Sequence, residues 1–88
     1  MFKIESKPEM TGTIRLALAG RIHANSLGEV RRAIERARRQ RASRVLLDLS
    51  EITLADRASI DFLMQQTREE IELINCPPYI QPWIAGER

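Results

Sequence analysis

The chain has 88 residues, of which 43% are hydrophobic and 30% charged, and its formal net charge at pH 7 is +2. This length holds one small domain with a modest core, and the composition excludes a disordered chain. No apolar run approaches the roughly 20 residues that a membrane helix needs, and the polar residues after Lys3 do not fit a signal peptide. With Cys76 as its single cysteine, no internal disulfide can form, so we expect a cytoplasmic protein.

The charges are unevenly distributed along the chain. Residues 15–44 carry nine arginines and two glutamates, whereas residues 45–88 carry three arginines and eight acidic residues. The basic cluster between Arg31 and Arg44 is typical of a surface that attracts phosphates, acidic lipids or an acidic protein, and equally of a solvated helix face. Because no aromatic residue interleaves with these arginines, the solvated face is favoured and nucleic-acid binding is the alternative.

The first half of the chain predicts a hairpin followed by a helix. We expect strands over residues 2–6 and 13–19, with a turn between them, because apolar residues alternate in the second segment and Pro8 and Gly12 lie in the turn. Ser26 and Glu29 have the spacing of a capping box, which predicts a helix over residues 27–40. Its apolar stripe recurs at steps of three and four residues.

The second half predicts strand, loop, helix and strand. Residues 45–49 are apolar except for Asp48 and predict a buried strand, and residues 50–55 are expected to form a connecting loop with some extended character. Asp56 is expected to cap a helix over residues 57–70, which faces inward with Ile60, Leu63, Met64 and Thr67. A last strand over residues 71–75 ends before two prolines, and a turn over residues 79–84 is expected to lay Trp83 on the core.

This order predicts an α/β fold: a small single domain with a mixed β-sheet and helices packed on one face. The N-terminal strands occupy residues 1–19, and residues 76–88 form a short C-terminal tail. A strand–helix–strand unit of this length favours a parallel pair with a right-handed crossover.

Three segments within residues 18–74 resemble the STAS domain, the fold of anti-sigma-factor antagonists and of the cytoplasmic ends of sulfate transporters. Residues 18–22 (LAGRI) resemble the strand and glycine before the family's first helix, and residues 45–50 (VLLDLS) resemble its central strand with a late aspartate. Residues 52–56 (ITLAD) resemble the loop that enters the second helix and ends in the family's aspartate. The resemblance covers about two thirds of the chain.

The sequence departs from the family at the site that a kinase phosphorylates. Antagonists of the family carry Asp-Ser-Ser-Gly at the start of the second helix, and the second serine is the acceptor. Here the four positions are Asp56, Arg57, Ala58 and Ser59, so the acceptor position has no hydroxyl. Ser59 lies about 100° further round the helix and does not simply replace it. In addition, His23 stands where the family often has an acid, and the tail is short for the family's closing helix.

The resemblance implies a non-catalytic regulatory module that binds a protein partner, such as an anti-sigma kinase, without the usual phosphoserine switch. A phosphate would place roughly −1.5 to −2 charges at the helix start and repel an acidic partner. We expect the partner surface to contain Asp56, Arg57, Ser59 and Asp61, although a capping carboxylate with solvated neighbours gives the same pattern. An accessory subunit of a lipid ABC transporter is an alternative within the fold, and homodimerisation stays open.

An enzymatic function is not expected. His23, Asp56 and Ser59 form a Ser/His/Asp set only in name, because no Gly-x-Ser-x-Gly motif or oxyanion-hole glycines surround Ser59. One histidine and one cysteine far apart in the sequence give no metal-binding spacing, and the glycines form no phosphate-binding loop. The sequence therefore predicts neither a cofactor nor a metal. Asp48 is expected to bond a neighbouring backbone amide, and Cys76 to pack as a small apolar residue.

Overall fold

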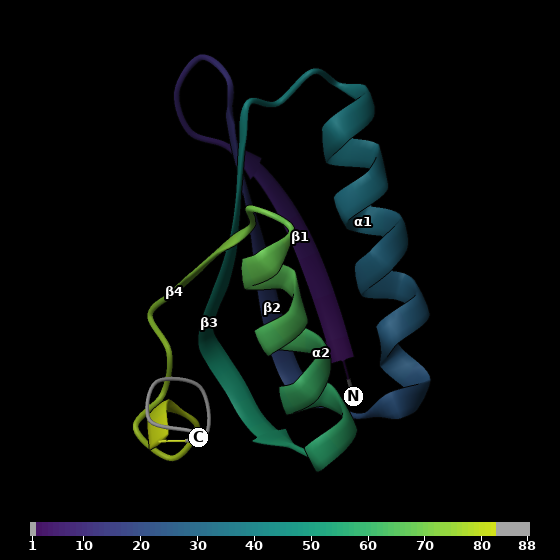
Figure 1. The fold of residues 1–88 in the computed structure, drawn as a ribbon, viewed down its shortest axis with the longest axis vertical. Helices are drawn as coiled ribbons and strands as arrows, with labels where there is room; N and C mark the ends of the chain where they lie inside the picture. The colour runs from purple at the N-terminus through teal and green to yellow at the C-terminus, as the bar shows by residue number, and fades with distance from the viewer. Residues whose placement is uncertain (1, 83–88) are drawn as a thin grey trace.

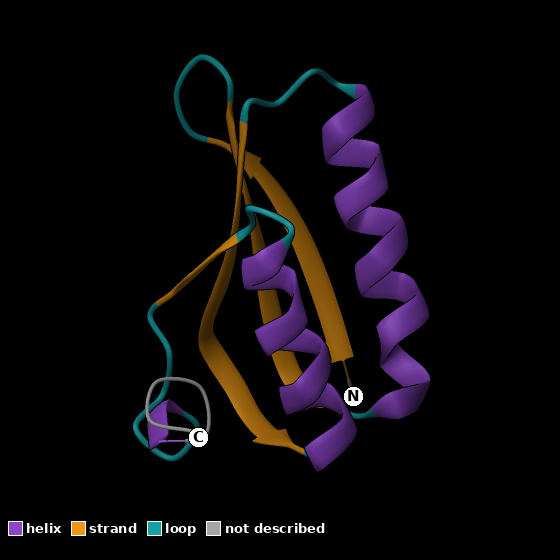
Figure 2. Cartoon of the chain, viewed as in Figure 1, coloured by secondary structure: helices purple, strands orange, loops and turns teal. Residues whose placement is uncertain are grey.

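The computed structural model describes residues 2–82, which form a four-stranded sheet with two helices packed against it (Figure 1). The elements follow one another as β1 (Phe2–Pro8), β2 (Thr13–Ile22), the 3₁₀ turn η1 (Ala24–Ser26), α1 (Leu27–Arg39), β3 (Arg44–Ala55), α2 (Arg57–Arg68) and β4 (Glu72–Ile74). The strands lie in the order β1-β2-β3-β4, with β1 antiparallel to β2, and β2, β3 and β4 parallel. Both helices cover the same face of the sheet (Figure 2), so the predicted fold class is confirmed.

The β1–β2 hairpin forms as predicted from the alternating apolar residues. Leu16 and Leu18 are buried under the helices, at 1% and 0% exposure. The turn closes where the Glu9 N–H donates to the Thr13 carbonyl at 3.0 Å, and Gly12 adopts a φ of 84° that glycine favours. The two strands are therefore held in a continuous register from Phe2 opposite Gly20 to Pro8 opposite Ile14.

The prediction of a loop over residues 50–55 was wrong, because β3 continues through them to Ala55. Most residues of this stretch are exposed or half-buried and only Ile52 is buried, so the sequence shows no alternation of apolar residues that would indicate a strand. Pairing with β2 continues past two register shifts, one of them beside Gly20, whose φ of 96° lets the strand bulge. Backbone pairing thus extends β3 through a stretch in which Ile52 is the one buried residue.

Of the predicted apolar stripe of the first helix (Leu27, Val30, Ile34 and Ala37), the last three are buried and Leu27 is half-buried, and Ala33, which was not predicted, is buried as well. The predicted capping box was wrong: the Ser26 side chain does not cap α1, and its buried hydroxyl lies 3.5 Å from the His23 N–H. The preceding turn η1 replaces it, because the Leu27 N–H donates to the Ala24 carbonyl. No helix in residues 2–82 is long and apolar enough to cross a membrane.

The second helix is buried along a slightly different line from the one predicted. Ile60 and Leu63 face the core as expected, but Phe62 is also buried and Thr67 is exposed. The Thr67 hydroxyl donates to the Met64 carbonyl at 2.6 Å and so is satisfied within the helix. The Arg31 guanidinium of α1 lies 5.0 Å above the Phe62 ring, which explains how an aromatic side chain is covered between the two helices.

The described part of the C-terminal tail closes over the end of β3. Ile80 is completely buried, and the Tyr79 hydroxyl donates to the Ile52 carbonyl at 2.7 Å. Backbone bonds from Ile80 and Gln81 to the Pro77 carbonyl form a turn that begins two residues before the expected range of 79–84. The prediction for Trp83 falls outside the described residues.

Candidate functional site

The candidate site lies at the edge of the sheet where β2 and β3 both end. Because these strands are parallel, their carboxyl ends meet at one edge, which is where α/β folds commonly place binding groups. There β2 leads into η1 and β3 leads into α2. The Asp56 N–H donates to the Ile22 carbonyl at 3.3 Å, which joins the two connections directly.

Asp56 holds this edge together with both of its carboxylate oxygens. Its Oδ1 accepts from the Ser59 N–H at 2.8 Å, so the predicted cap of α2 is confirmed. Its Oδ2 accepts from the Ala24 N–H at 3.1 Å, a contact that the sequence did not indicate. One aspartate therefore caps α2 and fixes the start of η1 against it.

The surroundings of Asp56 keep it ionised. The Ser59 hydroxyl and the Ser59 N–H lower the pKa of Asp56 below its ordinary value, the Ala24 N–H and the nearby His23 add smaller effects, and partial burial opposes them. The Ser59 hydroxyl lies close enough to act on the charge of the carboxylate, although it makes no hydrogen bond within residues 2–82. A negative charge at this position is also favoured by the dipole of α2.

Arg57 and Asp61 lie on the exposed first turns of α2. The Arg57 Nε donates to the Asp61 Oδ1 at 3.1 Å across one helical turn. Both side chains are well over half exposed, so the pair contributes little to stability and its two charges are presented to solvent.

Ala58 and Ser59 point in different directions, as the rotation of about 100° per residue requires. Ala58 is exposed beside Arg57, whereas Ser59 is completely buried. The expectation that Ser59 contributes to an exposed partner surface is therefore wrong. The Ser59 hydroxyl faces the interior because the apolar residues on either side of its helical face, Ile60 and Phe62, are drawn into the core.

The side chains of His23, Asp56 and Ser59 do not form a catalytic arrangement. The Asp56 oxygens accept backbone N–H bonds, and no hydrogen bond within residues 2–82 joins the His23 imidazole to Ser59. A serine nucleophile needs an exposed hydroxyl beside its base, and Ser59 is buried. Over the same residues, no group of three His, Cys, Asp or Glu side chains is placed to hold a metal ion.

A second polar cluster lies on the sheet face that the helices leave uncovered. The Arg15 Nη1 donates to the Asp48 Oδ2 at 2.6 Å, and the Arg15 Nε lies 2.6 Å from a Glu9 oxygen. The Asp48 Oδ1 accepts from the Ser50 N–H at 3.0 Å, as predicted, and from the Asn75 amide at 3.2 Å. Sequence reasoning missed Arg15 and Asn75, because only the strand register brings them to Asp48.

Asp48 is buried and charged at the same time. Burial raises the pKa of Asp48, but the hydrogen bonds from Ser50, Asn75 and Arg15 outweigh it and hold the pKa below its ordinary value. The carboxylate ties β2, through Arg15, and the segment after β4, through Asn75, to the middle of β3. This role is structural. It explains why an aspartate stands near the end of the apolar run of residues 45–49, which the sequence pattern alone did not explain.

Comparison with known proteins identifies the fold. No family model matches the sequence, and no curated protein matches it either. Among solved structures, the chain is similar to the anti-sigma factor antagonist SpoIIAA in its unphosphorylated form, with a TM-score of 0.70 and 14% sequence identity. The match covers 90% of this chain and 78% of that one. The chain therefore has the STAS fold that its three sequence motifs predicted.

Proposed function

We propose that the protein is a non-catalytic regulatory module of the anti-sigma-factor-antagonist type, which works in the cytoplasm and binds another protein through the start of α2. The STAS fold supports this proposal. The observation that carries it is the exposed group formed by Arg57, Ala58 and Asp61 beside the rigid cap at Asp56. We call this group the α2-start surface.

The α2-start surface is suited to a protein partner because it is rigid and mixed in charge. Asp56 fixes the first turn of α2 to η1, so little conformational freedom is lost when a partner binds. Arg57 and Asp61 offer one charge of each sign at a fixed spacing, which selects a partner of complementary charge. The exposed methyl group of Ala58 lies on the same turn, to one side of this pair, and permits close contact.

The same surface lacks a group that a kinase can modify. Ala58 has no hydroxyl, and the hydroxyl of the next residue, Ser59, is fully buried. A phosphate brings roughly −1.5 to −2 charges and would change binding at this place. Without an acceptor hydroxyl, phosphorylation cannot turn off binding through the α2-start surface. Binding is then regulated by the amount of this protein or by changes in the partner.

A charge inversion on the α2-start surface tests the proposal. Arg57→Glu combined with Asp61→Lys reverses both charges and retains an attractive pair one turn apart, so the helix keeps its stability. The matched control is Glu35→Arg with Arg39→Glu, an exposed pair of the same spacing on α1. The partner to titrate is the anti-sigma kinase of the same organism, by calorimetry.

We expect the inversion on α2 to weaken binding at least about tenfold, since surface charges at a contact centre are worth roughly 1.4 kcal/mol or more. The control on α1 should bind like the unaltered protein. Equal affinity of all three proteins, or binding only to a membrane permease, would contradict the proposal, and the second result would favour a transporter accessory subunit.

A second readout addresses the missing switch. The protein is incubated with the kinase and ATP, and its intact mass is measured. We expect no added phosphate on the unaltered chain and one added phosphate on an Ala58→Ser variant, which restores an exposed hydroxyl at the first turn. Phosphorylation of the unaltered chain at Ser59 would refute this part of the proposal.

A further inference from the structure

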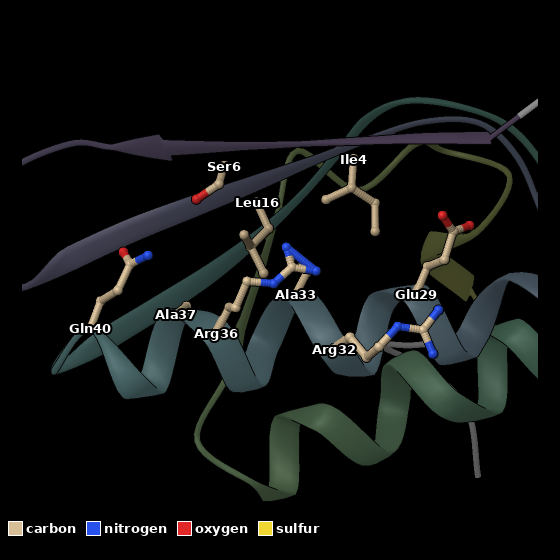
Figure 3. A pocket seen from close by; sticks show the side chains of 9 residues that line it. All are labelled: Ile4, Ser6, Leu16, Glu29, Arg32, Ala33, Arg36, Ala37 and Gln40. Atoms are coloured by element: carbon tan, nitrogen blue, oxygen red, sulfur yellow. The ribbon is translucent and has the colours of Figure 1, made fainter.

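A groove separates the edge of the sheet from α1, away from the α2-start surface. Its volume is about 340 Å³, and residues of both β1 and α1 line it. Figure 3 shows Ile4 and Leu16 directed from the strands toward the helix, where Ala33 and Ala37 present small side chains. The floor of the groove between β1 and α1 is therefore apolar.

The strand beside this groove has unused backbone hydrogen-bonding groups. β1 pairs only with β2, and at seven residues it is the longer of the two edge strands, since β4 has three. Pro8, which has no N–H, lies opposite Ile14 in a continuous antiparallel register. In an antiparallel ladder, hydrogen-bonded residue pairs alternate with pairs that are not hydrogen bonded. Because Pro8 has no N–H to donate, its pair with Ile14 is of the second kind. The backbone groups of Ile4 and Ser6 therefore point away from β2, toward the free edge.

Two arginines, Arg32 and Arg36, and one acidic residue, Glu29, line the groove, so its lining carries a net positive charge. Neither Arg32 nor Arg36 lies within ion-pair distance of an acidic side chain in residues 2–82. Four of the other five members of the basic cluster contact residues elsewhere, and one of these, Arg39, pairs with Glu35. Arg31 stacks on Phe62, Arg38 donates to the Glu69 carbonyl, and Arg44 binds Glu72. The cluster is thus divided between helix packing and a pair of charges that face the groove.

We propose that the groove between β1 and α1 binds an acidic polypeptide segment in an extended conformation, which adds to β1 as a further strand. The backbone of the segment bonds to the outward groups of Ile4 and Ser6, as in strand addition to other sheet edges. Every second side chain of the segment faces α1, and carboxylates at these positions reach Arg32 and Arg36 while their methylene groups cover the apolar floor. This site is separate from the α2-start surface and does not depend on it.

The observations favour this occupant over two others. A second copy that paired through β1 would bring its own Arg32 and Arg36 close to those of the first, and like charges repel. A single-stranded nucleic acid needs aromatic side chains for stacking, and none lines the groove. A nucleic acid also cannot use the free backbone edge as a strand does.

The test uses a fluorescent seven-residue peptide of alternating glutamate and valine, the length of β1, and measures its anisotropy with the full chain. We expect saturable binding that weakens with salt. A peptide N-methylated at alternate residues, which cannot pair along one side, should bind at least about tenfold more weakly, since two backbone bonds are lost. A valine–lysine peptide should not bind.

Protein variants separate strand addition from general attraction. Arg32→Glu with Arg36→Glu should reduce affinity at least about tenfold, whereas Arg39→Glu with Arg41→Glu, of equal net charge, should have little effect. Ser6→Pro removes one outward N–H and should also weaken binding. The proposal is overturned if the glutamate–valine peptide does not bind, if the two charge variants behave alike, if N-methylation has no effect, or if an oligothymidylate of similar charge competes equally.

Discussion

Removal of the Asp48 carboxylate is expected to destabilise the protein strongly, although this residue lies outside the proposed binding surfaces. Asp48 is 4% exposed and accepts bonds from Arg15, the Ser50 N–H and the Asn75 amide. The two uncharged donors are worth about 1 kcal/mol each, and the charged one about 1.5–3 kcal/mol. In an Asp48→Ala variant Arg15 keeps its contact with Glu9, so part of the charged contribution is retained. We therefore expect the free energy of unfolding to fall by about 3 kcal/mol.

Urea denaturation followed by circular dichroism measures this loss directly. For a domain of this size, about 3 kcal/mol corresponds to a melting temperature lower by roughly 12–24 °C. Glu51→Ala is the matched control, because Glu51 is exposed on the same strand and should change the free energy of unfolding by less than about 0.5 kcal/mol. A loss below about 1 kcal/mol for Asp48→Ala would refute the reasoning that these bonds stabilise the sheet.

The same carboxylate predicts a pH dependence. The folded state holds the pKa of Asp48 below the ordinary value of 3.8, so the group contributes stability above that pH and loses it as the pH falls through the folded pKa. Asp48→Asn removes this titration. The difference in unfolding free energy between the unaltered protein and Asp48→Asn should therefore be largest near neutral pH and shrink below pH 3.8. A difference independent of pH would contradict this account.

The remaining predictions concern the core and the surface. Leu47→Ala creates a cavity at a fully buried position and should cost about 3 kcal/mol in urea denaturation, whereas a collapse of the site would make the cost much smaller. Ala58→Glu adds an acid to the exposed start of α2 and should leave stability within about 0.5 kcal/mol, whereas Ser59→Glu buries a charge and should lower the melting temperature severely; similar stability of the two variants would show that Ser59 is accessible. Arg44→Ala breaks an exposed pair with Glu72 and should cost at most about 1 kcal/mol, less in high salt.

The elements that the sequence predicted correctly are those whose apolar residues follow one clear period. The stripe of α1 and the alternation in β2 were sufficient, because one face of each is buried over its whole length. The second half of β3 was missed because backbone pairing alone, with Ile52 as its one buried residue, keeps it extended. No pattern of side chains records such pairing.

The candidate site was predictable in part for the same reason. The cap at Asp56 is a local bond between neighbours in the sequence, and spacing predicts it. The contact from Asp56 to Ala24 and the cluster around Asp48 join segments that are far apart in the chain, and they depend on the strand register. The burial of Ser59 depends on a rotation of α2 by a fraction of a turn, which moves Thr67 outward and Phe62 inward.

The division of the basic cluster also required the structure. In the sequence, the arginines from Arg31 to Arg44 form one group, and the only property that distinguishes it is its positive charge. In the fold, Arg31 and Arg38 contact α2, whereas Arg32 and Arg36 line the groove beside β1. Net charge alone would have assigned them a single role.

The measurement that tests the central claim most directly is a map of backbone amide chemical shifts of the full chain, recorded with and without the anti-sigma kinase of the same organism. The account predicts that the largest changes cluster at Arg57, Ala58 and Asp61 and at the adjoining turn η1, while the amides of β4 stay unchanged. Changes confined to other surfaces, or no change at saturating kinase, would contradict the claim that the start of α2 is the partner-binding surface.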